Sequence, residues 1–126
     1  MKTRLFCTLA LAFMVSCGSR DTAKPVAEGR GVRLEFDQNL HSRVVARFGK
    51  SEVALGSFSP SEYVTSAGAE IRDFPLQAQA SAEVRDSFGK GLRKTFTGSA
   101  ASLKKEVAAT VYEDYPTAVV LQVRYT

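Results

Sequence analysis

The feature of this sequence that most restricts its fold is an alternation of apolar and polar residues with a period of two. Between residues 32 and 37, apolar Val, Leu and Phe alternate with charged Arg, Glu and Asp, and residues 43–48, 107–112 and 119–125 continue the pattern. A period of two sends successive side chains to opposite faces of a β-strand. Several such segments, separated by turns that contain glycine or proline, predict an all-β chain that folds as an antiparallel β-sandwich or barrel, and we expect the β-sandwich.

Two segments are compatible with a helix as well as with a strand. Residues 77–88 (QAQASAEVRDSF) are rich in alanine, which favours a helix, but glycines and a strand-like segment follow them. We interpret Ala80–Asp86 as a strand and Phe88–Gly91 as a hairpin connection. Ser102–Lys105 is a candidate first turn of a short helix. Pro75 predicts a sheet edge or a bend, since proline cannot donate to a central ladder.

The amino-terminal segment has the order of a secretory signal. Lys2 and Arg4 precede Leu5–Val15, an apolar run without charge, and Ser16 then precedes Cys17. A positive start, an apolar stretch and a small-residue cleavage position are typical of a signal peptide. The apolar run is shorter than the ~20 residues that a membrane-spanning helix needs. Because of the cysteine, the segment resembles a bacterial lipoprotein signal peptide. The alternative is an ordinary signal peptide in which Cys17 has no role.

The lipoprotein resemblance implies a division of the chain into three parts. Residues 1–16 are the signal peptide, residues 17–30 are the lipidated cysteine and a polar tether, and residues 31–126 are the β-sandwich domain. Cleavage before Cys17 and attachment of acyl chains to it would anchor the exported protein without spanning the bilayer, because two or more chains bind a membrane stably. Cys17 is followed by Gly and Ser rather than Asp. This favours the outer membrane, and the inner membrane is the alternative.

The charge and the cysteine content of the chain limit the classes of partner that we expect. Loss of residues 1–16 removes Lys2 and Arg4 and lowers the formal net charge from +4 to +2. Basic and acidic residues are interspersed, so we expect no nucleic-acid partner. Cys7 leaves with the signal and Cys17 carries lipid, so the exported chain has no disulfide. The expected partners are membrane lipid, through acylated Cys17, and an oligosaccharide. No cofactor is expected.

Four segments carry a second resemblance: Gly31–Asp37 (GVRLEFD), Leu103–Val107 (LKKEV), Val111–Pro116 (VYEDYP) and Leu121–Thr126 (LQVRYT). Together they resemble the amino-terminal β-supersandwich of bacterial α-galactosidase-like glycoside hydrolases. The resemblance implies that the catalytic carboxylates lie on a downstream (β/α) barrel, which this chain does not contain. We therefore expect no catalytic residue here, and we interpret the sandwich as incomplete at its carboxyl end.

The remaining chemistry-bearing residues form no recognisable metal or catalytic set. His41 has neither a cysteine nor a second histidine beside it for zinc, and one histidine does not define a triad with the serines. Tyr63, Phe74, Tyr112 and Tyr115 are candidate exposed rings for stacking on sugars, because an aromatic face is an apolar platform. We select Tyr112 and Tyr115, which flank a turn, as the pair for glycan stacking. Ordinary packing within the fold is the alternative for each.

Two functions follow from these patterns. In the first, the chain is the non-catalytic β-sandwich part of a membrane-anchored, α-galactosidase-like glycoside hydrolase. In the second, it is a free-standing envelope lipoprotein that binds a glycan or a protein.

Overall fold

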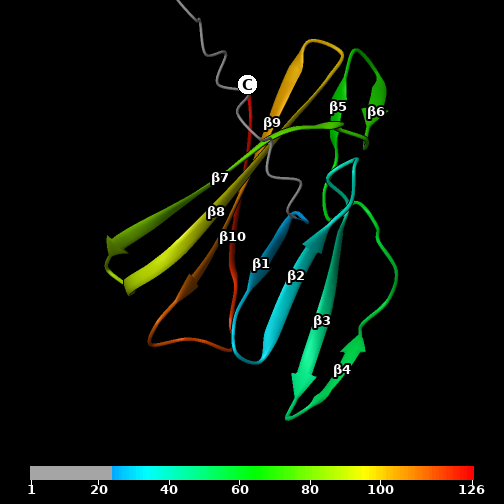
Figure 1. The fold of residues 1–126 in the computed structure, drawn as a ribbon. Helices are drawn as coiled ribbons and strands as arrows, with labels where there is room; N and C mark the ends of the chain where they lie inside the picture. The colour runs from blue at the N-terminus through cyan, green and yellow to red at the C-terminus, as the bar shows by residue number, and fades with distance from the viewer. Residues whose placement is uncertain (1–23) are drawn as a thin grey trace, which may run out of the picture.

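The computed structural model describes residues 24–126, which form ten β-strands (Figure 1). The strands are β1 (Val26–Glu28), β2 (Val32–Phe36), β3 (Ser42–Phe48), β4 (Ser51–Ala54), β5 (Val64–Ser66), β6 (Ala69–Ile71), β7 (Leu76–Asp86), β8 (Gly89–Ala100), β9 (Leu103–Tyr112) and β10 (Val120–Tyr125). All paired strands are antiparallel, and the described part of the chain contains no helix. The prediction of an all-β, antiparallel chain is confirmed.

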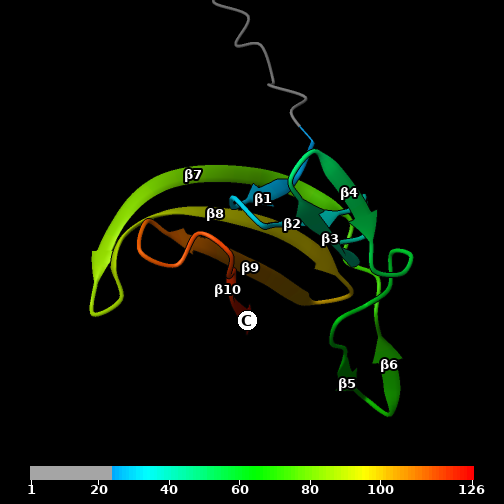
Figure 2. The same ribbon diagram turned by 90° about the horizontal axis from the view of Figure 1, so that it is seen from below.

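The strands form two four-stranded sheets and a separate hairpin. The N-terminal sheet has the order β1-β2-β3-β4, the C-terminal sheet has the order β10-β9-β8-β7, and β5 pairs with β6. Strands that follow one another in each sheet are also neighbours in space, so each sheet is a meander of hairpins. Figure 2 shows β7 and β8 as a long arc that extends beyond the N-terminal sheet.

The hydrophobic core lies between the two sheets. Ala27, Leu34 and Phe36 of the N-terminal sheet belong to one buried cluster with Phe96, Val107 and Ala109 of the C-terminal sheet. The rings of Phe36 and Phe96 are 4.7 Å apart between centroids, in a tilted arrangement. Leu40 and Phe74, from the connections between strands, complete the cluster and are fully buried. The period-two pattern therefore packs one face of each sheet against the other.

The ordered domain begins earlier than the sequence indicates. Val26–Glu28 lies within the predicted tether, yet it pairs with β2, and Ala27 is only 2% exposed. The predicted boundary at residue 31 is therefore wrong by a few residues. A three-residue strand is too short to show a period, which is why the pattern did not reveal it. The signal peptide and Cys17 lie outside the described residues.

The two ambiguous segments both fold as strands. The predicted strand Ala80–Asp86 is confirmed and belongs to the longer β7. The predicted hairpin connection at Phe88–Gly91 is wrong in its bounds, because the turn lies at residues 87–88 and β8 already begins at Gly89. The candidate helical turn at Ser102–Lys105 does not form, because Leu103 already begins β9. Leu103 and Lys105 are in phase with the buried Val107, so a strand brings all three to the core face. Pro75 lies between β6 and β7, and β7 is an edge strand.

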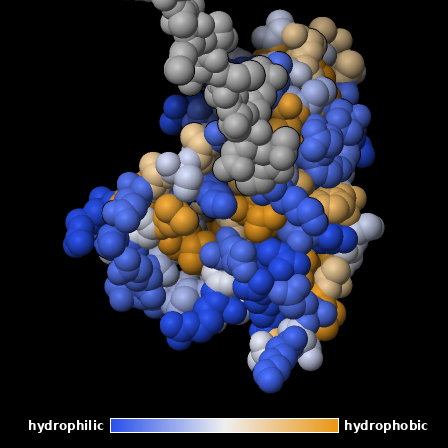
Figure 3. Space-filling model, in the orientation of Figure 1, coloured by the Kyte–Doolittle hydropathy of each residue, from blue (hydrophilic) through white to orange (hydrophobic). Residues whose placement is uncertain are grey.

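The core face of the N-terminal sheet continues past the C-terminal sheet. Val44 lies opposite the core residue Leu34, and Val53 lies opposite Ala46, so both face the core side. Their exposed fractions are nevertheless 37% and 48%, and that of Phe48 is 69%. In the orientation of Figure 3, hydrophobic surface is visible beside β3 and β4. We define the open apolar strip as four exposed residues of this region: Val44, Phe48, Val53 and Leu55.

The opposite face of the same sheet carries an ionic lattice. Glu35 accepts hydrogen bonds from Arg33 (2.8 Å) and Arg43 (2.5 Å), and Glu52 accepts from Arg33 and Arg47 at 2.8 Å each. Val45, on this face, is only 4% exposed. We define the ionic lattice as the six charged residues that these contacts and the Arg47–Glu28 pair connect: Glu28, Arg33, Glu35, Arg43, Arg47 and Glu52.

Candidate binding hollow

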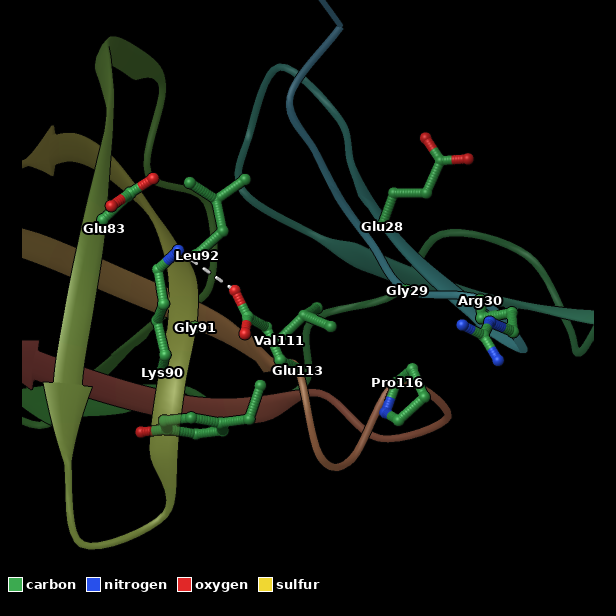
Figure 4. A pocket seen from close by; sticks show the side chains of 11 residues that line it. Glu28, Gly29, Arg30, Glu83, Lys90, Gly91, Leu92, Val111, Glu113 and Pro116 are labelled. Carbon is green, nitrogen blue, oxygen red and sulfur yellow. Dashed lines mark ion pairs between the residues drawn. The ribbon is translucent and has the colours of Figure 1, made fainter.

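A hollow of about 520 Å³ lies between the β1–β2 connection and the far half of the C-terminal sheet (Figure 4). Leu92 of β8 and Val111 of β9 lie opposite one another in register, and Glu83 of β7 lies opposite Leu92. Cross-strand partners share a face, so these three side chains point to the same side of the sheet. The residues that line the hollow are Glu28, Gly29, Arg30, Glu83, Lys90, Gly91, Leu92, Val111, Tyr112, Glu113 and Pro116.

The rim of the hollow is closed by a contact between two turns. The carbonyl oxygen of Pro116, in the β9–β10 turn, accepts hydrogen bonds from the backbone N–H of Arg30 (2.6 Å) and Gly31 (3.4 Å). A side chain at position 29 has no space, because a Cβ on Gly29 would lie 2.4 Å from the Pro116 oxygen. Glycine at position 29 is what allows the two turns to approach this closely.

The rim carries charges of both signs. Lys90 pairs with Glu113 at 3.2 Å, which Figure 4 shows as a dashed line, and both side chains are substantially exposed. Glu28 pairs with Arg47 of the ionic lattice, and Glu83 and Arg30 lie across the hollow from one another. The lining thus has three carboxylates and two cations around an aliphatic floor. This near balance of charge favours a neutral, hydrogen-bonding ligand over a strongly charged one.

The structure separates the two tyrosines selected from the sequence. Tyr112 is only 3% exposed, so the expectation that it is an exposed ring is wrong, whereas Tyr115 is 54% exposed. The Tyr112 hydroxyl donates to Asp86 at 2.6 Å, and its ring lies 5.5 Å from that of Phe88. That hydrogen bond raises the pKa of Tyr112 and lowers the pKa of Asp86. Tyr112 therefore packs within the fold and offers no free face to stack on a sugar.

The other two candidate rings, Phe74 and Tyr63, also differ from one another in their exposure. Phe74 is completely buried, which contradicts the expectation that it is exposed, and its ring lies 5.5 Å from that of Tyr125. Tyr63 is 53% exposed, as expected, and Arg72 lies over its ring at 5.2 Å. Tyr63 is not among the residues that line the hollow.

His41 has a structural partner on each ring nitrogen. Its Nε2 lies 2.7 Å from Asp73, and its Nδ1 lies 3.5 Å from Asp37. Asp37 also accepts from the backbone N–H of Asn39 and of His41, which fixes the β2–β3 connection. Among residues 24–126, no group of three or more histidine, cysteine or carboxylate side chains is arranged to hold a metal ion.

The sequence did not predict a buried ion pair at the other end of the core. Lys105 of β9 is fully buried, and its Nζ lies 2.5 Å from Glu62, 3.5 Å from the Leu40 carbonyl oxygen and 5.4 Å from the centre of the Phe74 ring. Among the described residues, the buried Tyr125 hydroxyl has no hydrogen-bond partner. Burial, followed by the charge of Glu62, raises the pKa of Tyr125. The one sequence signal for the burial of Lys105 is its spacing of two residues from Val107, which places both side chains on the same face of a strand.

Comparisons with protein-family models, with curated proteins and with solved structures found no match. No helix in the described residues is long and apolar enough to cross a membrane.

Proposed function

We propose that this protein is a lipid-anchored, non-catalytic binding module of the bacterial cell envelope. The proposal of an anchor rests on the order of charge, apolar run and Cys17 in the amino-terminal segment. Several acyl chains on one cysteine hold a protein at a membrane surface stably. The tether between Cys17 and β1 would place the β-domain close to that surface, where envelope polysaccharides are concentrated.

The observation that carries the binding function is the composition of the hollow. A sugar ring has an apolar C–H face and a rim of hydroxyl groups, so it is recognised by an apolar surface bordered by hydrogen-bonding groups. Leu92, which is 46% exposed, and Val111 give such a surface, and Lys90, Glu113 and Glu83 border it. Figure 3 shows hydrophobic surface between β1 and β8, surrounded by hydrophilic residues. We therefore propose a neutral oligosaccharide as the ligand.

A glycan-binding assay with the full chain in detergent tests this proposal. We expect wild-type protein to bind a neutral oligosaccharide, and Leu92→Glu to weaken that binding at least about tenfold, which corresponds to ~1.4 kcal/mol. Phe48→Glu, which introduces the same charge at an exposed apolar residue of the open apolar strip, is the matched control and should bind normally. Binding that is unchanged by Leu92→Glu, or absent from wild-type protein across a broad glycan panel, would refute the proposal.

The open apolar strip favours a second candidate function. Large exposed apolar areas on soluble proteins are uncommon and indicate a covered surface. If the two sheets are part of a larger β-supersandwich, further strands would lie on Val44, Phe48, Val53 and Leu55. The chain would then be the amino-terminal part of a membrane-anchored, α-galactosidase-like glycoside hydrolase, with catalysis on a separate barrel.

Intact mass separates the two candidates. The protein would be purified from a membrane fraction of the source organism and its lipidated form weighed. A species with the mass of residues 17–126 plus acyl chains supports the free-standing binding module. A much larger lipidated species that yields these peptides supports the glycoside hydrolase.

A further inference from the structure

The open apolar strip lies on one face of a single hairpin, formed by β3 and β4. Val44 and Phe48 lie on the core side of β3. Val53 lies on the same side of β4, and the Leu55 N–H donates to the Val44 carbonyl oxygen. Phe48 and Leu55, at 69% and 61%, are the two most exposed large hydrophobic residues in the described part of the chain. Exposed apolar areas of this kind mark a protein-binding or membrane-binding surface.

The turn of this hairpin projects away from the rest of the domain. Gly49, with a φ of 62°, and Lys50 form the turn between β3 and β4. A Cβ at Gly49 would meet no atom of the described residues within 4 Å. Figure 1 shows the β3–β4 turn farther out than the β1–β2 and β9–β10 turns at the same end of the molecule. Phe48 flanks the turn, so a flat surface that approaches this end of the molecule reaches its ring.

The two faces of the hairpin differ in polarity. On the face opposite the strip, Arg47 pairs with Glu52 at 2.8 Å, and Glu28 and Arg33 extend this pairing within the ionic lattice. A segment with one uncovered apolar face and one charged face is amphipathic. Such a segment lies in the boundary between water and lipid, with its apolar face toward the acyl chains. The N-terminal sheet has this arrangement at its β3–β4 end, in strands rather than in a helix.

The charge of the hairpin favours an anionic surface. Residues 42–54 carry three cations, Arg43, Arg47 and Lys50, and one carboxylate, Glu52, which gives a net charge of +2. Among the described residues, Lys50 has no ion-pair partner, whereas Glu52 is paired with two arginines. A lysine beside exposed apolar side chains is what an anionic phospholipid surface attracts.

The length of chain before β1 lets the hairpin reach the membrane that would carry the anchor. The Pro25 carbonyl oxygen accepts from the Phe36 N–H, and Phe36 pairs with Ser42, so Pro25 lies at the far end of β3 from the turn. The distance from Ser42 to Phe48 along β3 is about 20 Å, at ~3.3 Å per residue. The chain from Cys17 to Pro25 spans at most about 29 Å when extended. The tether is therefore long enough for the hairpin and the acylated cysteine to meet the same surface.

We propose that the open apolar strip inserts into the headgroup region of the membrane that carries the acyl anchor. This inference rests on the anchor proposed above, and it adds a second contact between the β-domain and the lipid. Phe48 and Leu55 lie at the boundary with the acyl chains, at a depth of about 5–10 Å. Lys50 pairs with the phosphate of an anionic phospholipid, and the ionic lattice faces water. The second contact fixes the orientation of the domain on the membrane, which a tether alone does not.

Tryptophan fluorescence of the protein in vesicles tests this proposal. The sequence contains no tryptophan, so Phe48→Trp introduces a unique fluorophore. The variant is purified from membranes and reconstituted into vesicles of phosphatidylethanolamine and phosphatidylglycerol in equal amounts, with or without bromine on the acyl chains, because bromine quenches tryptophan on contact. We expect emission at a shorter wavelength than in water and a loss of intensity in the brominated vesicles. Phe88→Trp, at an exposed ring on the β7–β8 turn, is the matched control and should keep its intensity.

A charge reversal at the turn tests the choice of lipid. Lys50→Glu, added to the Phe48→Trp protein, should reduce the quenching in the anionic vesicles. The reduction should disappear in vesicles of phosphatidylcholine alone, because that lipid carries no net charge. These substitutions replace exposed side chains, so the variants should fold, and circular dichroism checks that they do.

Unquenched emission from the Phe48→Trp protein would overturn the proposal, including the case in which further strands or another protein cover the strip. Equal quenching of the Phe48→Trp and Phe88→Trp proteins would also overturn it, because the contact would then not be specific to the hairpin. Intact mass of the same samples reports the acyl chains separately. If the mass shows no acyl chains, the anchor is refuted, and quenching after vesicles are added to that protein still decides whether the strip binds lipid.

Discussion

The ammonium group of Lys105 is a buried charge in the core, and a buried charge is costly unless a partner compensates it. It is fully buried, and its charge is balanced by Glu62, whose side chain retains 26% exposure. Removal of one partner from a buried pair leaves the other charge without compensation, at a cost of ~3–5 kcal/mol. The two partners of this pair are not equivalent, because a carboxylate at Glu62 can regain water whereas an ammonium at Lys105 cannot.

This difference predicts an asymmetric response to substitution. Glu62→Gln strands a buried cation and should lower the free energy of unfolding by ~3 kcal/mol or more, whereas Lys105→Met leaves a carboxylate that can hydrate and should cost less. The double variant should be more stable than Glu62→Gln alone. Urea unfolding of the four proteins measures this coupling. Equal losses in the two single variants, or additive losses in the double variant, would contradict the interpretation.

At this scale the sequence contains a signal for the burial of one partner of the pair, which we did not use, and none for the other. Lys105 has the same phase as Val107, so the alternation assigns it to the core face. Glu62 lies in the connection that precedes β5, where no periodic pattern operates, and only the folded chain brings it to Lys105. The same limit applies to Tyr112. The alternation assigns it to the outer face of β9, but the spacing of residues does not predict that the Phe88 ring packs against it there.

At the scale of elements, the residues with an unfavourable backbone conformation lie in the connections between strands. Leu40, Ala67 and Ala101 all have positive φ angles, of 57°, 49° and 51°. A residue with a Cβ in this left-handed region costs roughly 1–2 kcal/mol relative to right-handed backbone, and glycine avoids this cost. Leu40 is fully buried, so its burial offsets the strain, whereas Ala101 is an exposed residue of the β8–β9 turn.

We therefore predict that Ala101→Gly stabilises the protein. The expected gain in the free energy of unfolding is about 0.5–1 kcal/mol, since relief of the left-handed strain exceeds the added entropy of the unfolded chain. Thermal or urea unfolding measures the change. Ala108→Gly, in the middle of β9, is the control and should destabilise the protein. A loss of stability in Ala101→Gly would show that the turn is not strained.

Strand positions were largely predictable, because alternation is a local property. The short strand β1 was missed since three residues show no period. The start of β9 was left open between a helix and a strand, since Ala101 and Ser102 carry no glycine or asparagine signal for a hairpin turn. Which strands share a sheet was not predictable. The separation of β4 from β7 into different sheets depends on the docking of faces, and no local residue pattern encodes it.

At the scale of the whole molecule, the ionic lattice couples stability to pH. Hydrogen bonds from Arg43 lower the pKa of Glu35 below its ordinary value of 4.5, and those from Arg33 lower the pKa of Glu52. A lowered pKa in the folded state means that the unfolded chain binds protons first as the pH falls. The stabilisation is therefore complete above the ordinary pKa and is lost as the pH falls through the folded-state values.

The prediction is that stability decreases below about pH 4.5 and that Glu35→Gln reduces this dependence. The measurement is the urea midpoint between pH 7 and pH 3 for both proteins. The variant should be less stable than wild-type protein at pH 7, and the difference should narrow at pH 3. High salt should also narrow it, because 1 M salt shortens the screening length to about 3 Å. A difference that is constant with pH would exclude a role for the carboxylate charge.

The contact between the Pro116 carbonyl and the Arg30 and Gly31 amides has a consequence for the order of folding. Every strand pair in the two sheets is a hairpin between neighbours, so each meander forms from local contacts. The Pro116 contact joins residues near opposite ends of the described chain, and the entropy of closing so long a loop delays it. Sheet docking is then the late, slow step, with the millisecond-to-second times typical of β-proteins rich in distant contacts. For a chain exported as we propose, the apolar core face of the first sheet has no cover until β8 and β9, which carry Phe96, Val107 and Ala109, have left the export channel, and the envelope must tolerate that intermediate.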